Sequence, residues 1–328
     1  MAAMKHIGKA TLCLITALAA PAAMAQAGPA FPSRPITIVA PYSPGATADT
    51  EGRIYANQLS INFRQPVLVD FKPGAGTTIG MTYVARSAPD GYTLLLGSST
   101  YPLMPLVYRD LPYDPIKAFT PISLMSKRLA LLVVNPSLPI SNVAEYIAYA
   151  KAHPGEINFA TSGSGGIQHL TGAWLNSITG TQTTFIHYGK GTGSLIGDLL
   201  GGRVHMLPMT FSTGLPLVKS GKLRALGVAS LQRAPLLPDM PTLAEQGLRD
   251  FEYSSWLGIL APSRTPDGVI QTLAVELAKV ARTPEVVQKL SGDGFLIGNS
   301  PEEFRRHIQV EGDRWRKLVQ DAGIKFEE

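Results

Sequence analysis

Three loops rich in glycine and hydroxyl side chains are the segments of this sequence best suited to binding an anion. They read Pro44-Gly45-Ala46-Thr47-Ala48-Asp49, Gly74-Ala75-Gly76-Thr77-Thr78-Ile79-Gly80 and Thr161-Ser162-Gly163-Ser164-Gly165-Gly166. Each joins a predicted strand to a predicted helix, so free backbone N–H groups at a helix start could face a carboxylate or a phosphate. A tight turn capped by Thr or Ser explains any single loop about equally well. Three such loops, divided between two α/β domains, favour a ligand held between the domains.

Catalytic and metal-binding motifs are missing from the sequence. Ser164 lacks the glycine two positions earlier that a nucleophile elbow requires. Lys190 is followed by Gly191 and not by the hydroxyl residue of a phosphate loop. The five histidines beyond the N-terminal segment show no i, i+4 pairing. The glycines of 74–80 form a poor dinucleotide fingerprint, because the last one comes a residue late and the expected acidic residue is absent. We therefore expect no catalysis, no metal and no cofactor.

The elements that must position the three loops alternate between strand and helix. Apolar runs rich in β-branched residues predict strands at 36–40, 66–71, 92–96, 129–134, 157–160, 183–187, 223–229 and 253–261. Helical periodicity predicts helices at 48–63, from 77 onward, and at 143–152, 167–178, 192–200, 216–220, 266–282 and 301–322. This alternation is typical of parallel sheets covered by helices.

Composition indicates a folded chain with two domains. The 328 residues are 45% hydrophobic and 16% charged, and the length suits two domains of roughly 100–200 residues each. The 29 basic residues are spread along the chain with 24 acidic ones, so the net charge of +5 includes no basic block. That distribution disfavours nucleic-acid binding.

The N-terminal segment has the three parts of a signal peptide. Lys5 and Lys9 supply positive charge, residues 10–20 (ATLCLITALAA) are apolar, and Ala23-Met24-Ala25 is a small-x-small cleavage motif. The apolar run is shorter than the roughly 20 residues of a spanning helix. We expect cleavage after Ala25, which makes residues 1–25 the signal peptide of an exported, periplasmic protein. The single cysteine, Cys13, lies in this segment, so the mature chain has no thiol chemistry.

A series of motifs along nearly the whole mature chain resembles one family of receptors. The matching motifs are Arg34-Pro35-Ile36, Pro41-Tyr42-Ser43-Pro44-Gly45 with Asp49 and Arg53, Lys72-Pro73-Gly74-Ala75-Gly76 with Ile79-Gly80, Pro89-Asp90-Gly91-Tyr92-Thr93-Leu94, Leu111-Pro112-Tyr113-Asp114-Pro115, Ser162-Gly163 through His169-Leu170, Asp198-Leu199-Leu200-Gly201-Gly202, Gly221-Lys222-Leu223-Arg224-Ala225-Leu226 and Pro241-Thr242 with Glu245. In this order they are similar to the periplasmic solute receptors of tripartite tricarboxylate transporters, the Bug family.

The resemblance implies a type II periplasmic binding protein, or Venus flytrap, of the α/β class. Each of its two domains would be a mixed, mostly parallel sheet flanked by helices. We place domain 1 at residues 26–127 plus 251–328 and domain 2 at 128–250, with the ligand cleft between them. The strands near 126–129 and 252–257 would cross between the domains and act as the hinge.

The resemblance also implies how the ligand is held. Loop backbone and hydroxyl groups, rather than an arginine clamp, would bind its carboxylates. The implied contacts are Tyr42, Thr47, Ala48, Asp49, Gly76, Thr77, Thr78, Ser98 and Thr100 in domain 1, and Ser162, Ser164, Gly165, Gly166 and Met209 in domain 2. Arg53 follows Asp49 by four positions on the predicted helix, so we expect these two residues to pair with each other.

Departures from the family pattern concern the identity of the ligand. Ala46 and Thr77 stand where the family has glycines, and Tyr188 has slipped by one position. Met209 replaces a family acid, which removes a partner for an ammonium group and disfavours an amino acid as the ligand. With Trp256 and other aromatic residues nearby, Met209 would accept a flat apolar body. The alternative is that these side chains belong to the core.

These inferences predict a monomeric periplasmic receptor for a small organic carboxylate, preferably an aromatic or dicarboxylic acid. It would deliver this ligand to the membrane subunits of a transporter. Two alternatives stay open at this point: a ligand-sensing subunit that reports to a signalling partner, and a secreted hydrolase that uses Ser164.

Overall fold

The computed structural model describes residues 31–45, 47–108, 111–161, 163, 166–188, 192–253, 255–321 and 323–324. The predicted signal peptide and its cleavage site lie outside this range. None of the helices in the described part of the chain combines the length and apolarity that crossing a bilayer requires.

The larger of two sheets is built from both ends of the chain. Its strand order is β11-β4-β10-β3-β1-β2. These strands are β1 (Ile36–Ala40), β2 (Val67–Phe71), β3 (Thr93–Ser98), β4 (Phe119–Arg128), β10 (Ser255–Pro262) and β11 (Gly294–Leu296). The helical segments in the same part of the chain are α1 (Thr47–Phe63), η1 (Ala75–Thr77), α2 (Thr78–Ala85), η2 (Tyr101–Leu103), α3 (Met104–Val107), α8 (Asp267–Val280), α9 (Pro284–Leu290), η3 (Ser291–Asp293) and α10 (Pro301–Asp321).

Alternating side chains of the larger sheet pack against different helices. Ile38 and Leu94 point to the face that buries Leu59 of α1 and Leu273 of α8. Their neighbours Val39 and Leu95 point to the opposite face, which is covered by Met81 of α2 and Phe304 of α10. Because successive strand residues face opposite sides, this sheet is buried on both faces.

The smaller sheet lies within one continuous stretch of chain. Its order is β7-β6-β8-β5-β9. The strands are β5 (Ala130–Val134), β6 (Asn158–Thr161), β7 (Thr184–His187), β8 (Met206–Thr210) and β9 (Arg224–Val228), and the helices are α4 (Val143–Ala152), α5 (Ile167–Thr179), α6 (Thr192–Leu200) and α7 (Phe211–Lys219). Leu132 packs with Tyr146 of α4, whereas its neighbour Leu131 packs with Leu199 of α6 and Phe211 of α7.

Both sheets are mixed and flanked by helices, which confirms the predicted fold class. The sequence suggested that most strand pairs would be parallel, but parallel pairs do not predominate. Among the described strands, β1–β2, β1–β3, β6–β7 and β6–β8 are parallel, and β3–β10, β4–β10, β4–β11, β5–β8 and β5–β9 are antiparallel. The reason is that strands which carry the chain from one sheet to the other run against their neighbours.

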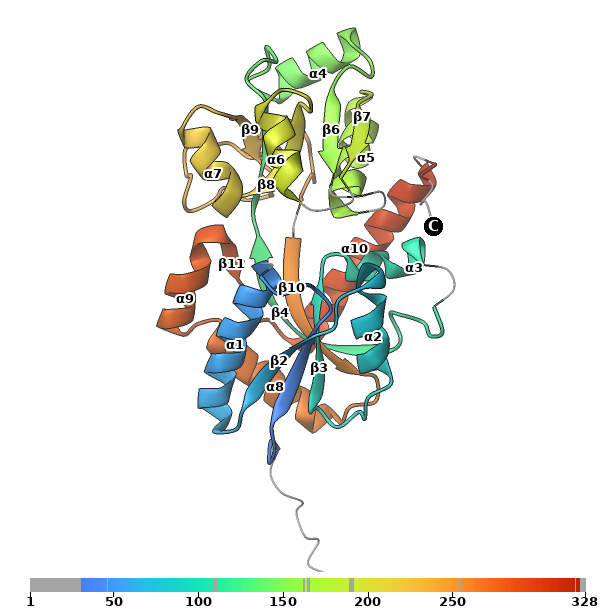
Figure 1. Ribbon diagram of the computed structural model, residues 1–328, viewed down its shortest axis with the longest axis vertical. Coiled ribbons are helices and arrows are strands. Elements are labelled where there is room, and N and C mark those ends of the chain that lie inside the picture. Colours follow the sequence, from blue (N-terminus) through green and yellow to red (C-terminus); the bar gives the residue numbers. More distant parts are fainter. Residues whose placement is uncertain are drawn as a thin grey trace, which may run out of the picture. The chain divides into compact units, whose positions relative to one another are not determined.

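The chain passes between the two sheets twice, and both passages lie next to the paired strands β4 and β10. β4 ends at Arg128 and β5 begins at Ala130, so Leu129 alone separates them. The return path leads past Tyr253 into β10, and Ser255 pairs with Arg128 across the two strands. Figure 1 shows β4 and β10 side by side within the larger sheet. The crossings coincide with the predicted hinge positions, and the hinge motion itself stays a prediction.

Candidate functional site

A cavity of about 240 Å³ lies where residues of both sheets and their loops meet. Its lining comes mostly from the larger sheet: Tyr42, Ala48, Ser98, Ser99, Thr100, Arg128, Ser255 and Leu257. Ile167 and Thr210 contribute from the side of the smaller sheet. Tyr42 and Thr100 follow the carboxyl ends of the neighbouring strands β1 and β3, the edge where α/β sheets place ligands.

Apart from the Arg128 guanidinium, the polar side chains of this cavity carry hydroxyl groups. Ser98 Oγ and Thr100 Oγ1 are 3.0 Å apart, and both side chains hydrogen-bond Tyr42. Burial raises the pKa of Tyr42 to about 12, although the hydrogen bonds oppose part of that increase. The phenol is therefore neutral at physiological pH. Each of the three hydroxyls carries one proton, and a hydroxyl that turns away from its neighbours can donate that proton to an anion.

The first predicted loop is closed by its own carboxylate. The Gly45 N–H donates to Asp49 Oδ2 over 2.8 Å, and Arg53 forms an ion pair with Asp49. The Gly45 hydrogen bond, together with Arg53, holds the pKa of Asp49 below its usual value. The predicted pairing of Asp49 with Arg53 is confirmed. Ala48 lines the cavity itself, and the side chain of Thr47 lies outside the described residues.

The second predicted loop keeps a left-handed backbone despite losing a family glycine. Gly76 has φ 58°, and Thr77, which stands where the family has glycine, has φ 83°. A Cβ at Gly76 would lie 1.6 Å from the Tyr108 hydroxyl and would displace that side chain, and the positive φ independently favours glycine. Thr78 Oγ1 donates to the Ala75 carbonyl over 2.8 Å. Thr77 lines a smaller space that shares Tyr42, Ser98 and Thr100 with the main cavity.

The third predicted loop is described only at its edges. Ser162, Ser164 and Gly165 lie outside the described residues. Gly166 is the N-cap of α5, in extended conformation, and its N–H donates to the Gly163 carbonyl over 3.4 Å. The next residue, Ile167, lines the cavity. The helix that follows this loop therefore begins at the cavity, and binding of a ligand by the loop itself stays a prediction.

A buried ion pair beside the cavity was not found from the sequence. Arg128 Nη2 donates to Glu51 Oε2 over 2.6 Å, and Ser126 Oγ donates to Glu51 Oε1 over 2.5 Å. Both charged side chains are buried. Glu51 therefore neutralises the guanidinium that lines the cavity, which fits recognition by hydroxyl groups rather than by an arginine clamp. The sequence did hold a signal for the burial of Glu51. This residue precedes the core residue Tyr55 by four positions on α1, so both lie on the buried face of the helix.

The side chains proposed for a flat apolar ligand are core residues. Met209 is buried in a cluster with Leu131 and Phe211, and its neighbour Thr210 lines the cavity instead. Trp256 is fully buried, and its Nε1–H donates to Glu311 Oε2 over 2.5 Å. This agrees with the core interpretation that the sequence left open.

Tyr188 also has a partner away from the cavity. Its hydroxyl donates to Asp198 Oδ2 over 2.7 Å, and Arg203 pairs with the same carboxylate. Tyr188, which has slipped by one position relative to the family, thus interacts with residues of the smaller sheet's own part of the chain.

The sequence did not predict Thr210, Ser255 and Leu257 as cavity-lining residues. They come from strands whose pairing partners are distant in sequence.

The comparisons with known proteins agree on one family. The family model described as tripartite tricarboxylate transporter family receptor (TctC) matches residues 52–324. BugT of Bordetella pertussis is 35% identical over 303 residues, which cover 90% of this chain and 91% of BugT.

Two solved structures from Rhodopseudomonas palustris have the same fold. Rpa4515 with adipate is 33% identical, with a TM-score of 0.78 over 90% of this chain and 100% of that one. MatC with bound malate is 29% identical, with a TM-score of 0.73 over 88% of this chain and 100% of that one. The chain belongs to the tripartite tricarboxylate transporter receptors, a family of periplasmic solute-binding proteins that serve membrane transporters and are not enzymes.

Proposed function

We propose that this receptor captures a short dicarboxylate in the periplasm and delivers it to the membrane subunits of its transporter. The observation that carries the proposal is the cavity of about 240 Å³, where hydroxyl groups from both sheets converge. It is smaller than the roughly 300–1,000 Å³ of pockets for drug-sized molecules, so the ligand should be small. The adipate of Rpa4515 and the malate of MatC are ligands of this chemistry.

The lining favours an aliphatic dicarboxylate over an aromatic acid. Its apolar members are Ala48, Ile167 and Leu257, which suit a short methylene chain. Trp256 and Met209, the side chains expected to pack against a flat ring, are buried in the core. Hydroxyls of Ser98 and Thr100 on one side and Thr210 on the other could each receive one carboxylate.

The proposal also covers predicted contacts that lie outside the described residues. Ser162, Ser164 and Gly165 would bind the second carboxylate through backbone N–H and hydroxyl groups. The domains would be 26–127 plus 251–328 and 128–250, and cleavage after Ala25 would release a monomeric mature chain. Mass spectrometry of the exported protein tests the cleavage site, and light scattering after size exclusion tests the monomer.

Calorimetry on the exported protein tests the ligand class. Adipate and malate should bind one to one and be recovered unchanged, whereas hexanoate and benzoate should bind at least about tenfold more weakly, because they leave one end of the site unpaired. Benzoate binding more tightly than either dicarboxylate would contradict the proposal.

Uptake of labelled dicarboxylate by cells tests delivery. Deleting the receptor should abolish high-affinity uptake, and the wild-type gene should restore it. Unchanged uptake combined with altered gene expression would instead assign the chain to ligand sensing.

A further inference from the structure

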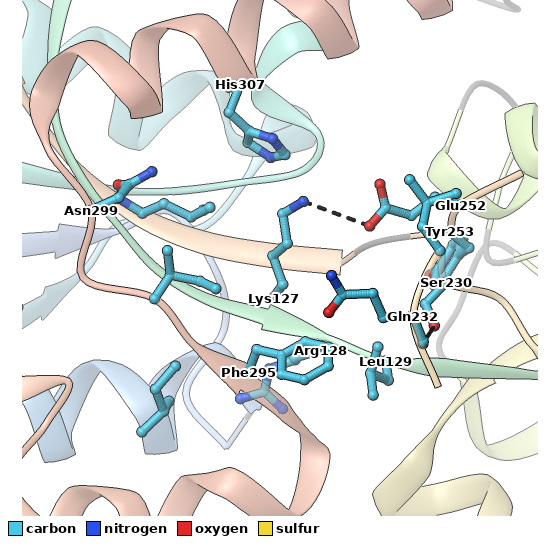
Figure 2. A pocket seen from close by; sticks show the side chains of 14 residues that line it. Lys127, Arg128, Leu129, Ser230, Gln232, Glu252, Tyr253, Phe295, Asn299 and His307 are labelled. Atoms are coloured by element: carbon cyan, nitrogen blue, oxygen red, sulfur yellow. Dashed lines mark hydrogen bonds and ion pairs between the residues drawn. The ribbon is translucent and has the colours of Figure 1, made fainter. Parts of the chain in front are cut away.

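A second cavity, of about 540 Å³, lies beside the strands that connect the two sheets. It is distinct from the carboxylate cavity, since only Arg128 lines both. Figure 2 shows Lys127 of β4 reaching into it between His307 of α10 and Glu252, with Gln232 nearby. Residues on both sides of the strand crossing therefore face the same space.

Two opposite charges form a loose ion pair in the lining of this second cavity. Lys127 Nζ lies 3.6 Å from Glu252 Oε1, farther than the 2.7–2.9 Å or so of a charge-assisted hydrogen bond. The two side chains are 25% and 17% exposed. Within the described part of the chain neither of them makes a hydrogen bond. Both groups therefore keep unused hydrogen-bonding capacity in a place largely shielded from water.

The other ionisable groups of the lining add no net charge. The Arg128 guanidinium is paired with Glu51. Burial, reinforced by the charges of Lys127 and Arg314, lowers the pKa of His307 to about 3, so its ring is neutral at physiological pH. The second cavity thus presents one cation and one anion together with neutral polar groups.

Apolar side chains complete the lining. Phe295 of β11, its neighbours Leu296 and Ile297, and Leu129 at the crossing line the same space. A ligand with a branched or aromatic side chain could bury that part against them while its polar part meets Lys127 and Glu252.

We propose that the second cavity binds a small zwitterion, an apolar α-amino acid whose carboxylate meets Lys127 and whose ammonium meets Glu252. A ligand with a negative charge alone would be repelled by Glu252, and one with a positive charge alone by Lys127. A zwitterion makes a favourable interaction with both groups and supplies the hydrogen bonds that they lack. The two cavities share only Arg128 among their lining residues, so the zwitterion would not compete with the dicarboxylate for the same groups.

Calorimetry with L-leucine and two analogues tests the charge requirement. The exported protein, saturated with adipate, should bind leucine one to one. It should bind 4-methylpentanoate, which lacks the ammonium, and 3-methylbutylamine, which lacks the carboxylate, at least about tenfold more weakly. Equal binding of either analogue overturns the proposal. So does failure of leucine, isoleucine, valine, methionine and phenylalanine alike at millimolar concentration.

Variants assign the binding to this cavity. Lys127→Met and Glu252→Gln should each weaken leucine binding at least about tenfold while adipate binding is retained, after circular dichroism has shown native folding. The control is Lys289→Met, which breaks the exposed Lys289–Glu285 pair and should leave leucine binding unchanged. Thr100→Val, in the dicarboxylate site, should also leave leucine binding unchanged. Leucine binding that is lost in Thr100→Val and kept in Lys127→Met would refute the second site without affecting the dicarboxylate proposal.

Discussion

At the scale of single residues, the candidate site depends on hydroxyl groups that hold one another in place. Ser98 and Thr100 hydrogen-bond each other and Tyr42, and the high pKa of Tyr42 keeps its phenol protonated. Such preorganised donors lose little freedom when an anion binds. Ser98 is the last residue of β3 and Thr100 comes two residues later, so this strand fixes their position.

Removing one of these donors should weaken dicarboxylate binding. For Thr100→Val, which keeps the side-chain shape and loses the hydroxyl, we expect a loss of about 1.5–3 kcal/mol in adipate binding, as for a hydrogen bond to a charged group. Calorimetry measures this loss. The control is Thr272→Val on α8, whose hydroxyl bonds only its own helix and which should bind adipate normally. Normal adipate binding by Thr100→Val would mean that this hydroxyl does not contact the ligand.

Asp49 should make the stability of the first loop depend on pH. Its pKa lies below the usual 3.8 because of the Gly45 N–H and Arg53, so the carboxylate stabilises the fold above that pH and ceases to do so as the pH falls through the lowered value. We expect Asp49→Asn to lower the melting temperature at neutral pH. The difference from wild type should narrow as the pH drops below about 3.8. A difference that is constant with pH, in thermal melts followed by circular dichroism, would show that the ionised carboxylate contributes nothing.

Arg53 should matter for stability and not for recognition. Its guanidinium pairs with Asp49 and lies over the Phe71 ring, 5.0 Å from the centroid. We therefore expect Arg53→Ala to lower the melting temperature slightly while adipate affinity, measured on the folded variant, stays within about threefold of wild type. A well-folded Arg53→Ala that no longer binds adipate would establish an arginine clamp.

At the scale of elements, α1 is anchored to β4 by a buried ion pair. Glu51 on α1 accepts hydrogen bonds from Ser126 and Arg128 on β4, so the helix that begins beside the cavity cannot shift without separating these charges. Breaking a buried pair by removing one partner costs more than the pair contributes, because the remaining charge is left in a poorly solvated place.

Neutralising this helix anchor should destabilise the whole larger domain. We expect Glu51→Gln to reduce the free energy of unfolding by about 3–5 kcal/mol. Glu285→Gln, at an ion pair on α9 with Glu285 65% exposed, should change it by less than about 0.5 kcal/mol. Urea denaturation of both variants makes the comparison. Equal stability of the two variants would show that the buried pair is energetically unimportant.

Elements that depend on local patterns were predicted well, and those that depend on distant partners were not. The helix at 143–152 was predicted at its observed bounds, because Asn142 caps it and its apolar residues recur with helical spacing. Only the end of β4 was predicted, as a crossing strand near 126–129. Its first part was missed because Pro121 and Ser123 interrupt the apolar run, although pairing with β10 holds the strand in place. The glycine-rich loops were recognisable in the same local way, whereas Arg128 and Ser255 reach the cavity only through that long-range pairing.

At the scale of the whole molecule, the two sheets are connected in a way that permits rotation. The chain crosses at Leu129 and again just after Tyr253, so few backbone torsions need to change. A dicarboxylate that contacts Thr100 and Thr210 together would favour the closed arrangement. We expect small-angle scattering to give a smaller radius of gyration with saturating adipate than without it. Identical profiles would contradict closure.

The last helix gives the receptor a built-in optical signal. Trp315 of α10 and Trp174 of α5 lie with ring centroids 5.9 Å apart, nearly perpendicular, in a cluster with Leu170 and Leu318. One indole belongs to a helix of the larger sheet and the other to the helix that begins beside the ligand cavity, whereas Trp256 is enclosed in the core. Any rotation of one sheet against the other alters the surroundings of this indole pair alone. If the sheets rotate as predicted, the tryptophan fluorescence of the unlabelled protein will report ligand capture in real time, because two of its three tryptophans form this pair.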